Sequence, residues 1–202
     1  MITRRTIFFC IGLFILALGI SLMIIADIGA AAWDALNVGL SEKIGLTVGN
    51  WVIIVGIFLM FVNALLLRAR PEFLSIGTII LIGFFIDFWL LIVLDEWNLE
   101  GWIVKSLVLL AGLVIAGLGI SIYLQAKFPL SPIDNLMLAI SKRFKLKVGI
   151  SKTIGEATGL IFALLFGGPI GIGTLVVTFG LGPIIQIFFP YFERWMEKGA
   201  KG

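Results

Sequence analysis

The chain has 202 residues, of which 60% are hydrophobic and 13% are charged, and its formal net charge is +3. Soluble domains carry about 25% charged residues, so this composition excludes an ordinary soluble domain. The chain has no histidine and one cysteine, Cys10. These counts exclude an intrachain disulfide, histidine-based catalytic triads and histidine-rich zinc sites. The small positive charge fits loops that face anionic lipid better than it fits nucleic-acid binding.

Six hydrophobic segments are each long enough to cross a hydrocarbon core of about 30 Å. They are predicted at about residues 6–26, 48–67, 73–94, 103–125, 150–167 and 170–190. The last two are separated by FGGPIG, in which Gly167, Gly168 and Pro169 interrupt the helix. The sequence therefore predicts an all-α integral membrane protein, a single membrane domain over residues 1–202 whose main partner is the lipid bilayer.

The positive charges predict the orientation of these spans. With six spans, all of the 15 Lys and Arg residues except Lys43 and Lys105 fall on one side of the membrane. Lys and Arg are enriched in cytoplasmic loops. Both termini are therefore expected in the cytoplasm.

An internal repeat relates the two halves of the chain. The segment GLFILALGIS at 12–21 resembles GLVIAGLGIS at 112–121, and the same offset aligns Asp34 with Asp134. The repeats cover about 6–95 and 103–192, and each contains three spans. Because three is odd, the second repeat should enter the membrane in the opposite direction. Inverted-topology repeats are common in secondary transporters, whose substrate sites lie at the repeat interface; the alternative is a duplication that only built a stable bundle.

A short helix is predicted after the first span of each repeat, at 33–43 and 132–143. In the second, Ser131 suits the N-cap, Pro132 the first helical position and Asp134 the third, as in a capping box. Two interpretations stay open. The aspartates either cap interfacial helices, or the helices are re-entrant and their N-termini meet near the midplane. In the second case the substrate site would include Asp34, Asn37, Asp134 and Asn135.

Two further acids lie within spans. Asp87, in GFFIDFWLL, is either a neutral or hydrogen-bonded structural residue or a proton or cation site, because a charged acid is costly in lipid. Glu156 lies between Gly155 and Gly159, and it is expected to form a structural pair with Lys152.

Glycines recur every seven residues in the first span of each repeat, at Gly12, Gly19, Gly112 and Gly119. Small residues allow close helix packing in membranes. These faces are expected to serve packing, and they are the surface on which a homodimer would form.

The segment LGISLMIIADIGAAAWDALNVGLS, followed by TVGNW, resembles the first repeat of the YczE/YyaS/YitT bacterial membrane proteins. The resemblance rests on Ile28, Gly29, Trp33 and Asp34 and on a Pro-x-Asp stretch at Pro132 and Asp134. It covers nearly the whole chain and is nearest to the YczE branch. The resemblance implies a multi-pass protein of a bacterial plasma membrane, and it implies no reaction.

The expected function is that of a small transporter or permease with an unknown small-molecule or ion substrate. The predicted substrate-binding residues are Trp33, Asp34, Asn37, Asp87, Asp134 and Asn135. The alternative is a non-transporting membrane regulator or accessory subunit that binds a partner through helix–helix contacts. An intramembrane enzyme is the weakest of three classes, because no HExxH, GxSxG or GxGD-type motif is present, although an aspartyl mechanism with Asp87 and Asp34 stays open. Enzymatic activity, a metal and a cofactor are not expected.

Overall fold

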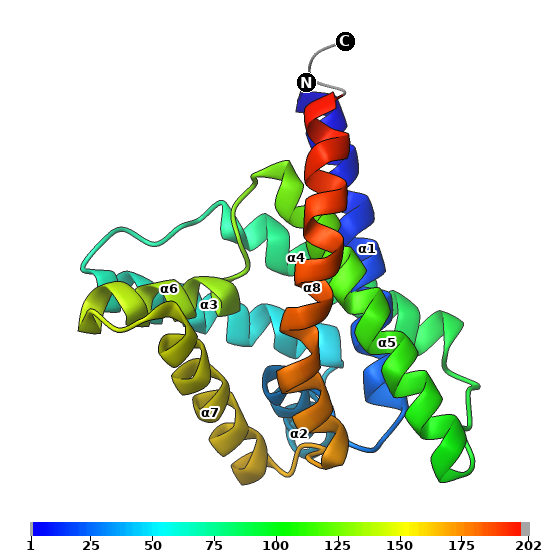
Figure 1. Cartoon of the computed structure of the whole chain (residues 1–202). Helices are drawn as coiled ribbons and strands as arrows, with labels where there is room; N and C mark the ends of the chain where they lie inside the picture. The colour runs from blue at the N-terminus through cyan, green and yellow to red at the C-terminus, as the bar shows by residue number, and fades with distance from the viewer. Residues whose placement is uncertain (1, 199–202) are drawn as a thin grey trace. The chain divides into compact units, whose positions relative to one another are not determined.

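The computed structural model describes residues 2–198, which form helices and connecting loops without a strand (Figure 1). The elements are α1 (Ile2–Ile25), α2 (Ala32–Ile44), α3 (Val48–Leu67), α4 (Ser75–Phe88), the π-helical segment η1 (Trp89–Val93), α5 (Trp102–Tyr123), the 3-10 turn η2 (Leu124–Ala126), α6 (Pro132–Phe144), α7 (Val148–Phe166) and α8 (Ile172–Lys198). Lys201, one of the basic residues behind the predicted orientation, lies outside the described residues.

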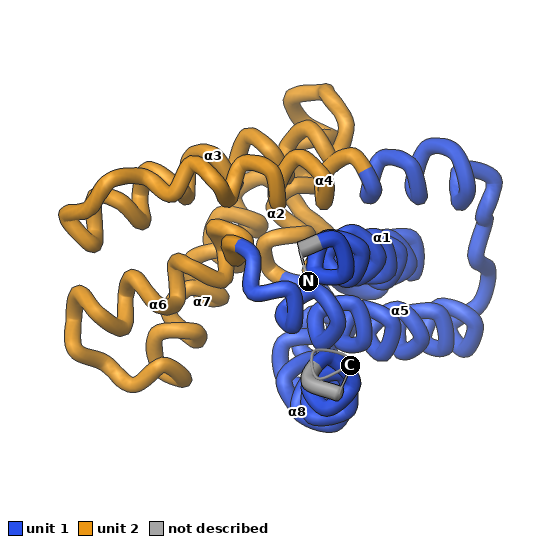
Figure 2. Tube along the Cα trace, turned by 90° about the horizontal axis from the view of Figure 1, so that it is seen from above, with its two compact units in different colours: residues 1–31, 85–128, 171–202 blue, residues 32–84, 129–170 orange. Residues whose placement is uncertain are grey.

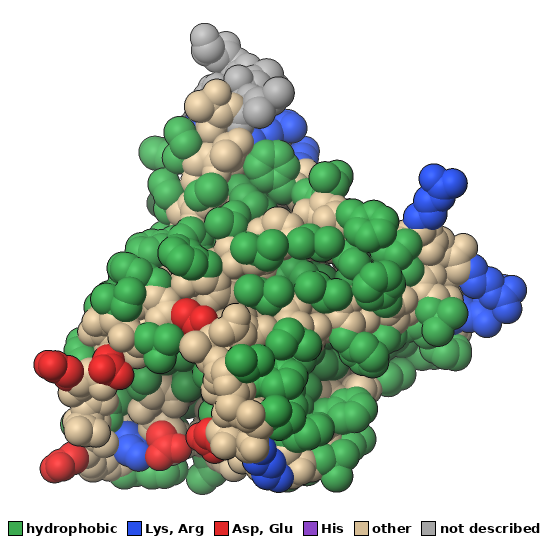
Figure 3. Space-filling view, turned by 180° about the vertical axis from the view of Figure 1, so that it is seen from behind, with side chains coloured by type: hydrophobic (Ala, Val, Ile, Leu, Met, Phe, Trp, Pro, Cys, Tyr) green, Lys and Arg blue, Asp and Glu red, His purple; other side chains and the backbone are tan. Residues whose placement is uncertain are grey.

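Six segments of the described chain are long and apolar enough to cross a membrane, which confirms the predicted spans. They are Thr3–Ile25, Val48–Leu67, Ser75–Val93, Trp102–Ala126, Val148–Phe166 and Ile172–Met196. The last span continues beyond its predicted end at 190, because α8 includes Pro183 and Pro190 without ending there. Large hydrophobic side chains cover much of the face seen in Figure 3, as expected of a surface in contact with lipid.

The chain divides into two compact units, each built from both halves of the sequence (Figure 2). Unit 1 comprises residues 1–31, 85–128 and 171–202, and unit 2 comprises residues 32–84 and 129–170. The spans α1, α5 and α8 belong to unit 1. The two short helices α2 and α6 belong to unit 2, together with α3, α7 and most of α4.

Within unit 1, α1 and α5 cross in close contact and run antiparallel. A Cβ atom on Gly12 would lie 2.5 Å from the backbone nitrogen of Tyr123, and one on Gly112 would lie 2.9 Å from the Met23 side chain. Residue numbers thus rise along α1 while they fall along α5. Between these points, a Cβ on Gly19 would clash with Ala116 and one on Gly119 with Leu16.

The helices α1 and α5 therefore run in opposite directions within unit 1, and the inverted repeat stays a prediction. The glycine faces are also covered within the chain itself. A homodimer, which stays a prediction, would need a different surface.

Within unit 2, the packing of one repeat mirrors that of the other. Helix α2 packs on α7 and α3, and the matching helix α6 packs on α3 and α7. The ends of the short helices also match. The Ser41 hydroxyl donates to the carbonyl of Leu46 at 2.7 Å, and the Ser141 hydroxyl donates to the carbonyl of Leu146 at 2.8 Å. Unit 2 thus contains contacts between the two repeats.

Candidate functional site

The start of α6 has the predicted cap. The backbone N–H of Asp134 donates to the Ser131 hydroxyl at 3.3 Å, and that hydroxyl donates to the Asp134 carboxylate at 2.9 Å. Pro132 occupies the first turn of the helix. The first bond satisfies the backbone N–H of Asp134, and the second holds its carboxylate at the Ser131 hydroxyl.

Asp34 occupies the same place in the first turn of α2, but its surroundings differ. Ala31 stands where the second repeat has Ser131, so no hydroxyl is available for the reciprocal bond. Among the described residues, no hydrogen bond to the Asp34 carboxylate is found. Helix capping therefore explains Asp134 better than it explains Asp34.

The Asp34 carboxyl group lies where α2 packs against α7, and its side chain is partly buried. Burial raises the pKa of Asp34 from its ordinary 3.8 to about 7, and the negative charge of nearby Glu156 contributes to the rise. Burial disfavours the charged form of an acid, and so does a second carboxylate. Near neutral pH, Asp34 can therefore exchange a proton.

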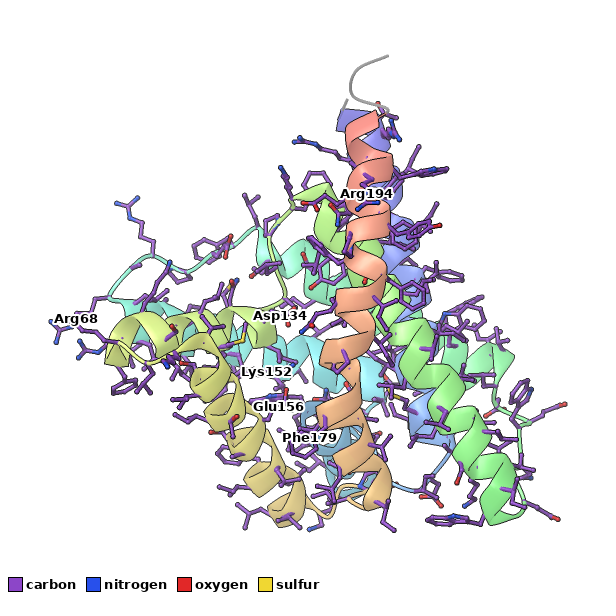
Figure 4. The ribbon with its side chains drawn as sticks, in the orientation of Figure 1. Arg68, Asp134, Lys152, Glu156, Phe179 and Arg194 are labelled. Carbon is purple, nitrogen blue, oxygen red and sulfur yellow. The ribbon has the colours of Figure 1, made fainter. Side chains whose placement is uncertain are left out.

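Glu156 links the two aspartates that the repeat aligns. Its carboxylate interacts electrostatically with Asp34, with Asp134 and with Lys152. Figure 4 shows Glu156 and Lys152 on α7 and Asp134 at the start of α6. The acidic cluster of unit 2, defined as Asp34, Asp134 and Glu156, is therefore built by both repeats. Glu156 is not among the residues predicted for the site from sequence, because Lys152 one turn earlier offers it a structural partner.

Asn37 adds a second, independent feature to this part of unit 2. It lies one turn after Asp34, on the same side of α2. Its side chain is 1% exposed, and neither atom of its amide has a hydrogen-bond partner among the described residues. A buried amide without a partner costs about 1–3 kcal/mol and is rare in folded proteins. The Asn37 amide thus has hydrogen-bonding capacity that the described residues leave unused.

The remaining predicted residues have other contacts. The Trp33 indole packs on α7 at Gly159, where a Cβ would lie 2.9 Å from the ring, and its role in substrate binding stays a prediction. The Asn135 amide donates to the Glu72 carboxylate at 2.9 Å. Asp87 is partly buried in the last turn of α4 and belongs to unit 1. Over residues 2–198, no group of three or more His, Cys, Asp or Glu is placed to hold a metal ion.

The fold defines a multi-pass α-helical membrane protein with two short non-spanning helices. The chain belongs to the family of unknown function DUF6198, whose model matches residues 3–190.

The chain is similar to proteins of Bacillus subtilis and of Haemophilus influenzae. It is 42% identical to the "Uncharacterized protein YyaS" of Bacillus subtilis (strain 168) over 98% of this chain and 99% of the relative. It is 35% identical to the "Uncharacterized membrane protein YczE" of the same organism, over 94% and 87% of the two chains. A protein of Haemophilus influenzae is 26% identical to this chain, over 89% of this chain and 81% of the relative. No solved structure matches the chain.

Proposed function

We propose that this protein is a small transporter or permease of the bacterial plasma membrane, with both termini in the cytoplasm. Its solute site includes Asn37 and the acidic cluster of unit 2. The observation that carries the proposal is the buried, unpartnered amide of Asn37, one turn from a carboxyl group that can exchange a proton near neutral pH. An unpartnered polar group and a carboxyl group that exchanges a proton are both features that a site for a solute or ion can use.

The position of the site in the repeat supports the proposal. Helix α2 comes from the first repeat, and α6 and α7 come from the second, so the site lies where the repeats meet within unit 2. The antiparallel crossing of α1 and α5 supports an inverted topology. Transporters with inverted repeats place their substrates at the repeat interface.

Flux through the purified protein tests this proposal. Proteoliposomes with an internal pH indicator would be exposed in turn to pools of small amines, organic acids and sugars, with a pH gradient imposed. At least one pool should move or carry protons faster than in empty liposomes. Asp34→Asn and Asn37→Leu should abolish that flux. Asp95→Asn makes the same chemical change at an exposed loop residue and should leave it unchanged.

The alternative function is a regulator that binds a partner through glycine-rich helix faces. The faces formed by Gly12, Gly19, Gly112 and Gly119 are covered within unit 1, which removes the predicted contact surface. If the folded wild-type protein moves no pool faster than empty liposomes do, the transport proposal fails, and a regulator would have to bind its partner through another surface.

A further inference from the structure

Unit 2 contains a cavity of about 160 Å³ between the end of α3, the start of α4 and α6, lined by both apolar and polar residues. Neither Asn37 nor any member of the acidic cluster lines it. Met60 and Leu138 line apolar parts of the cavity. Liquid water occupies about 30 Å³ per molecule, so the cavity has room for roughly five water molecules or a small organic molecule.

Asn63 lines this cavity, and its amide has a hydrogen-bond acceptor without a donor among the described residues. Asn63 is 7% exposed, and its Nδ2 donates to the Pro132 carbonyl at 2.8 Å. Because a carbonyl only accepts, this contact fixes which way the amide points. Its Oδ1 is buried and finds no donor among the described residues. A ligand that fills the cavity should therefore carry a hydroxyl or ammonium donor.

The exposed end of the cavity is positively charged. Arg70 and Lys142 line it, and over the described part of the chain neither forms an ion pair. Glu72 also lines it, and its carboxylate accepts a hydrogen bond from Asn135 at 2.9 Å. Two cations and one carboxylate leave a net positive charge. Because an arginine fork and a lysine ammonium both bind phosphate and carboxylate, this end favours an anion.

We propose that this cavity binds a small organic phosphate or carboxylate that also carries a hydrogen-bond donor. The anionic group lies between Arg70 and Lys142, and the donor reaches Oδ1 of Asn63. This inference does not depend on transport. The same chemistry occurs in a free metabolite and in a phospholipid headgroup such as phosphoglycerol, and the experiment separates these two sources.

The first arm uses soluble probes and isothermal titration of the purified protein. Glycerol 3-phosphate has both the anion and the donors, methyl phosphate has the anion alone, and glycerol has the donors alone. Glycerol 3-phosphate should bind about tenfold more tightly than methyl phosphate, and glycerol should not bind measurably.

Three variants test the assignment of residues. Asn63→Leu should remove the preference for glycerol 3-phosphate over methyl phosphate. Arg70→Gln should weaken the binding of both by about tenfold, since it removes a charged hydrogen-bond donor. Arg68→Gln removes an exposed arginine two residues away that does not line the cavity, so it should change neither affinity. If Asn63→Leu does not fold, Lys142→Gln takes its place, with the same expected loss as Arg70→Gln.

The second arm places the protein in nanodiscs of phosphatidylcholine and adds short-chain phosphatidylglycerol. Saturable binding of the lipid that Arg70→Gln weakens, without binding of free glycerol 3-phosphate, identifies a headgroup site. Binding of the free anion identifies a metabolite site. The proposal is overturned if neither probe binds, or if Arg70→Gln and Arg68→Gln affect binding equally.

Discussion

Asp34 and Asp134 show how one neighbouring side chain changes the chemistry of an acid. Both lie in the first turn of a short helix, at positions that the repeat aligns. Ser131 engages Asp134 in a cap, whereas Ala31 cannot do so for Asp34. Asp34 is left beside Glu156 in a partly buried position, where its proton affinity rises. Capping therefore accounts for the position of Asp134 but not for that of Asp34, and the place of both acids in a solute site stays a proposal.

The raised pKa of Asp34 predicts that the folded protein loses stability as pH rises. The native carboxyl titrates near 7 and the unfolded one near 3.8. The native state therefore binds more protons between these values, and the free energy of unfolding falls across this range and levels off above it. One pKa unit corresponds to about 1.4 kcal/mol, so the total loss is at most about 4 kcal/mol. Thermal unfolding in detergent from pH 4 to pH 8 measures it.

Asp34→Asn should remove most of this pH dependence, and Asp95→Asn should retain it. Asp34 faces Glu156, which in turn interacts with Lys152 and Asp134. These neighbouring charged groups remain in the variant. A small residual dependence of stability on pH is therefore expected for Asp34→Asn. Equal slopes in the wild type and in Asp34→Asn would show that Asp34 titrates normally.

At the scale of elements, the contact of α2 with α7 depends on a glycine. At Gly159, a Cβ would lie 2.9–3.1 Å from atoms of the Trp33 indole, so Gly159→Ala should force α2 and α7 apart. Overpacking of this kind costs about 1–3 kcal/mol. Gly149 lies in the same helix with nothing within 4 Å of a Cβ, and Gly149→Ala should be neutral or stabilising. Thermal unfolding of both variants compares the costs, and equal melting temperatures would contradict this packing.

The sequence predicts the elements well because their signals are local. Hydrophobic length defines the spans, and Ser131 with Pro132 defines the start of α6. The association of Glu156 with Asp34 depends on α2 packing on α7, which no local pattern specifies.

Two adjacent residues of α6 illustrate the same limit. Asp134 and Asn135 were predicted to share a site, but successive side chains of a helix point in different directions. Asn135 instead reaches Glu72 in the turn before α4. The cavity lined by Asn63 and Arg70 also depends on tertiary packing, since it forms where α3, α4 and α6 converge. No local sequence pattern predicts it.

At the scale of the whole molecule, the distribution of basic residues predicts the orientation in the membrane. Reporter fusions after Glu42, Asn98 and Gly168 should report the outside, and fusions after Arg70 and Lys145 should report the cytoplasm. The side of the membrane at each position is measured with two fusions, one to alkaline phosphatase, which is active outside, and one to a reporter that is active in the cytoplasm. Reversal at any of these positions would remove the inverted-repeat argument for transport.

A solute site in unit 2 must open to water during a transport cycle, although Asn37 is 1% exposed in this structure. Single cysteines in a Cys10→Ser background test this directly, with small charged methanethiosulfonate reagents applied to membrane vesicles of either orientation. Asn37→Cys should be modified, and Ala35→Cys, which is buried by packing, should not. Glu42→Cys, an exposed position in the same helix, shows that the reagent reaches α2. Modification at position 42 without any at position 37, from either side, would contradict a solute site at Asn37.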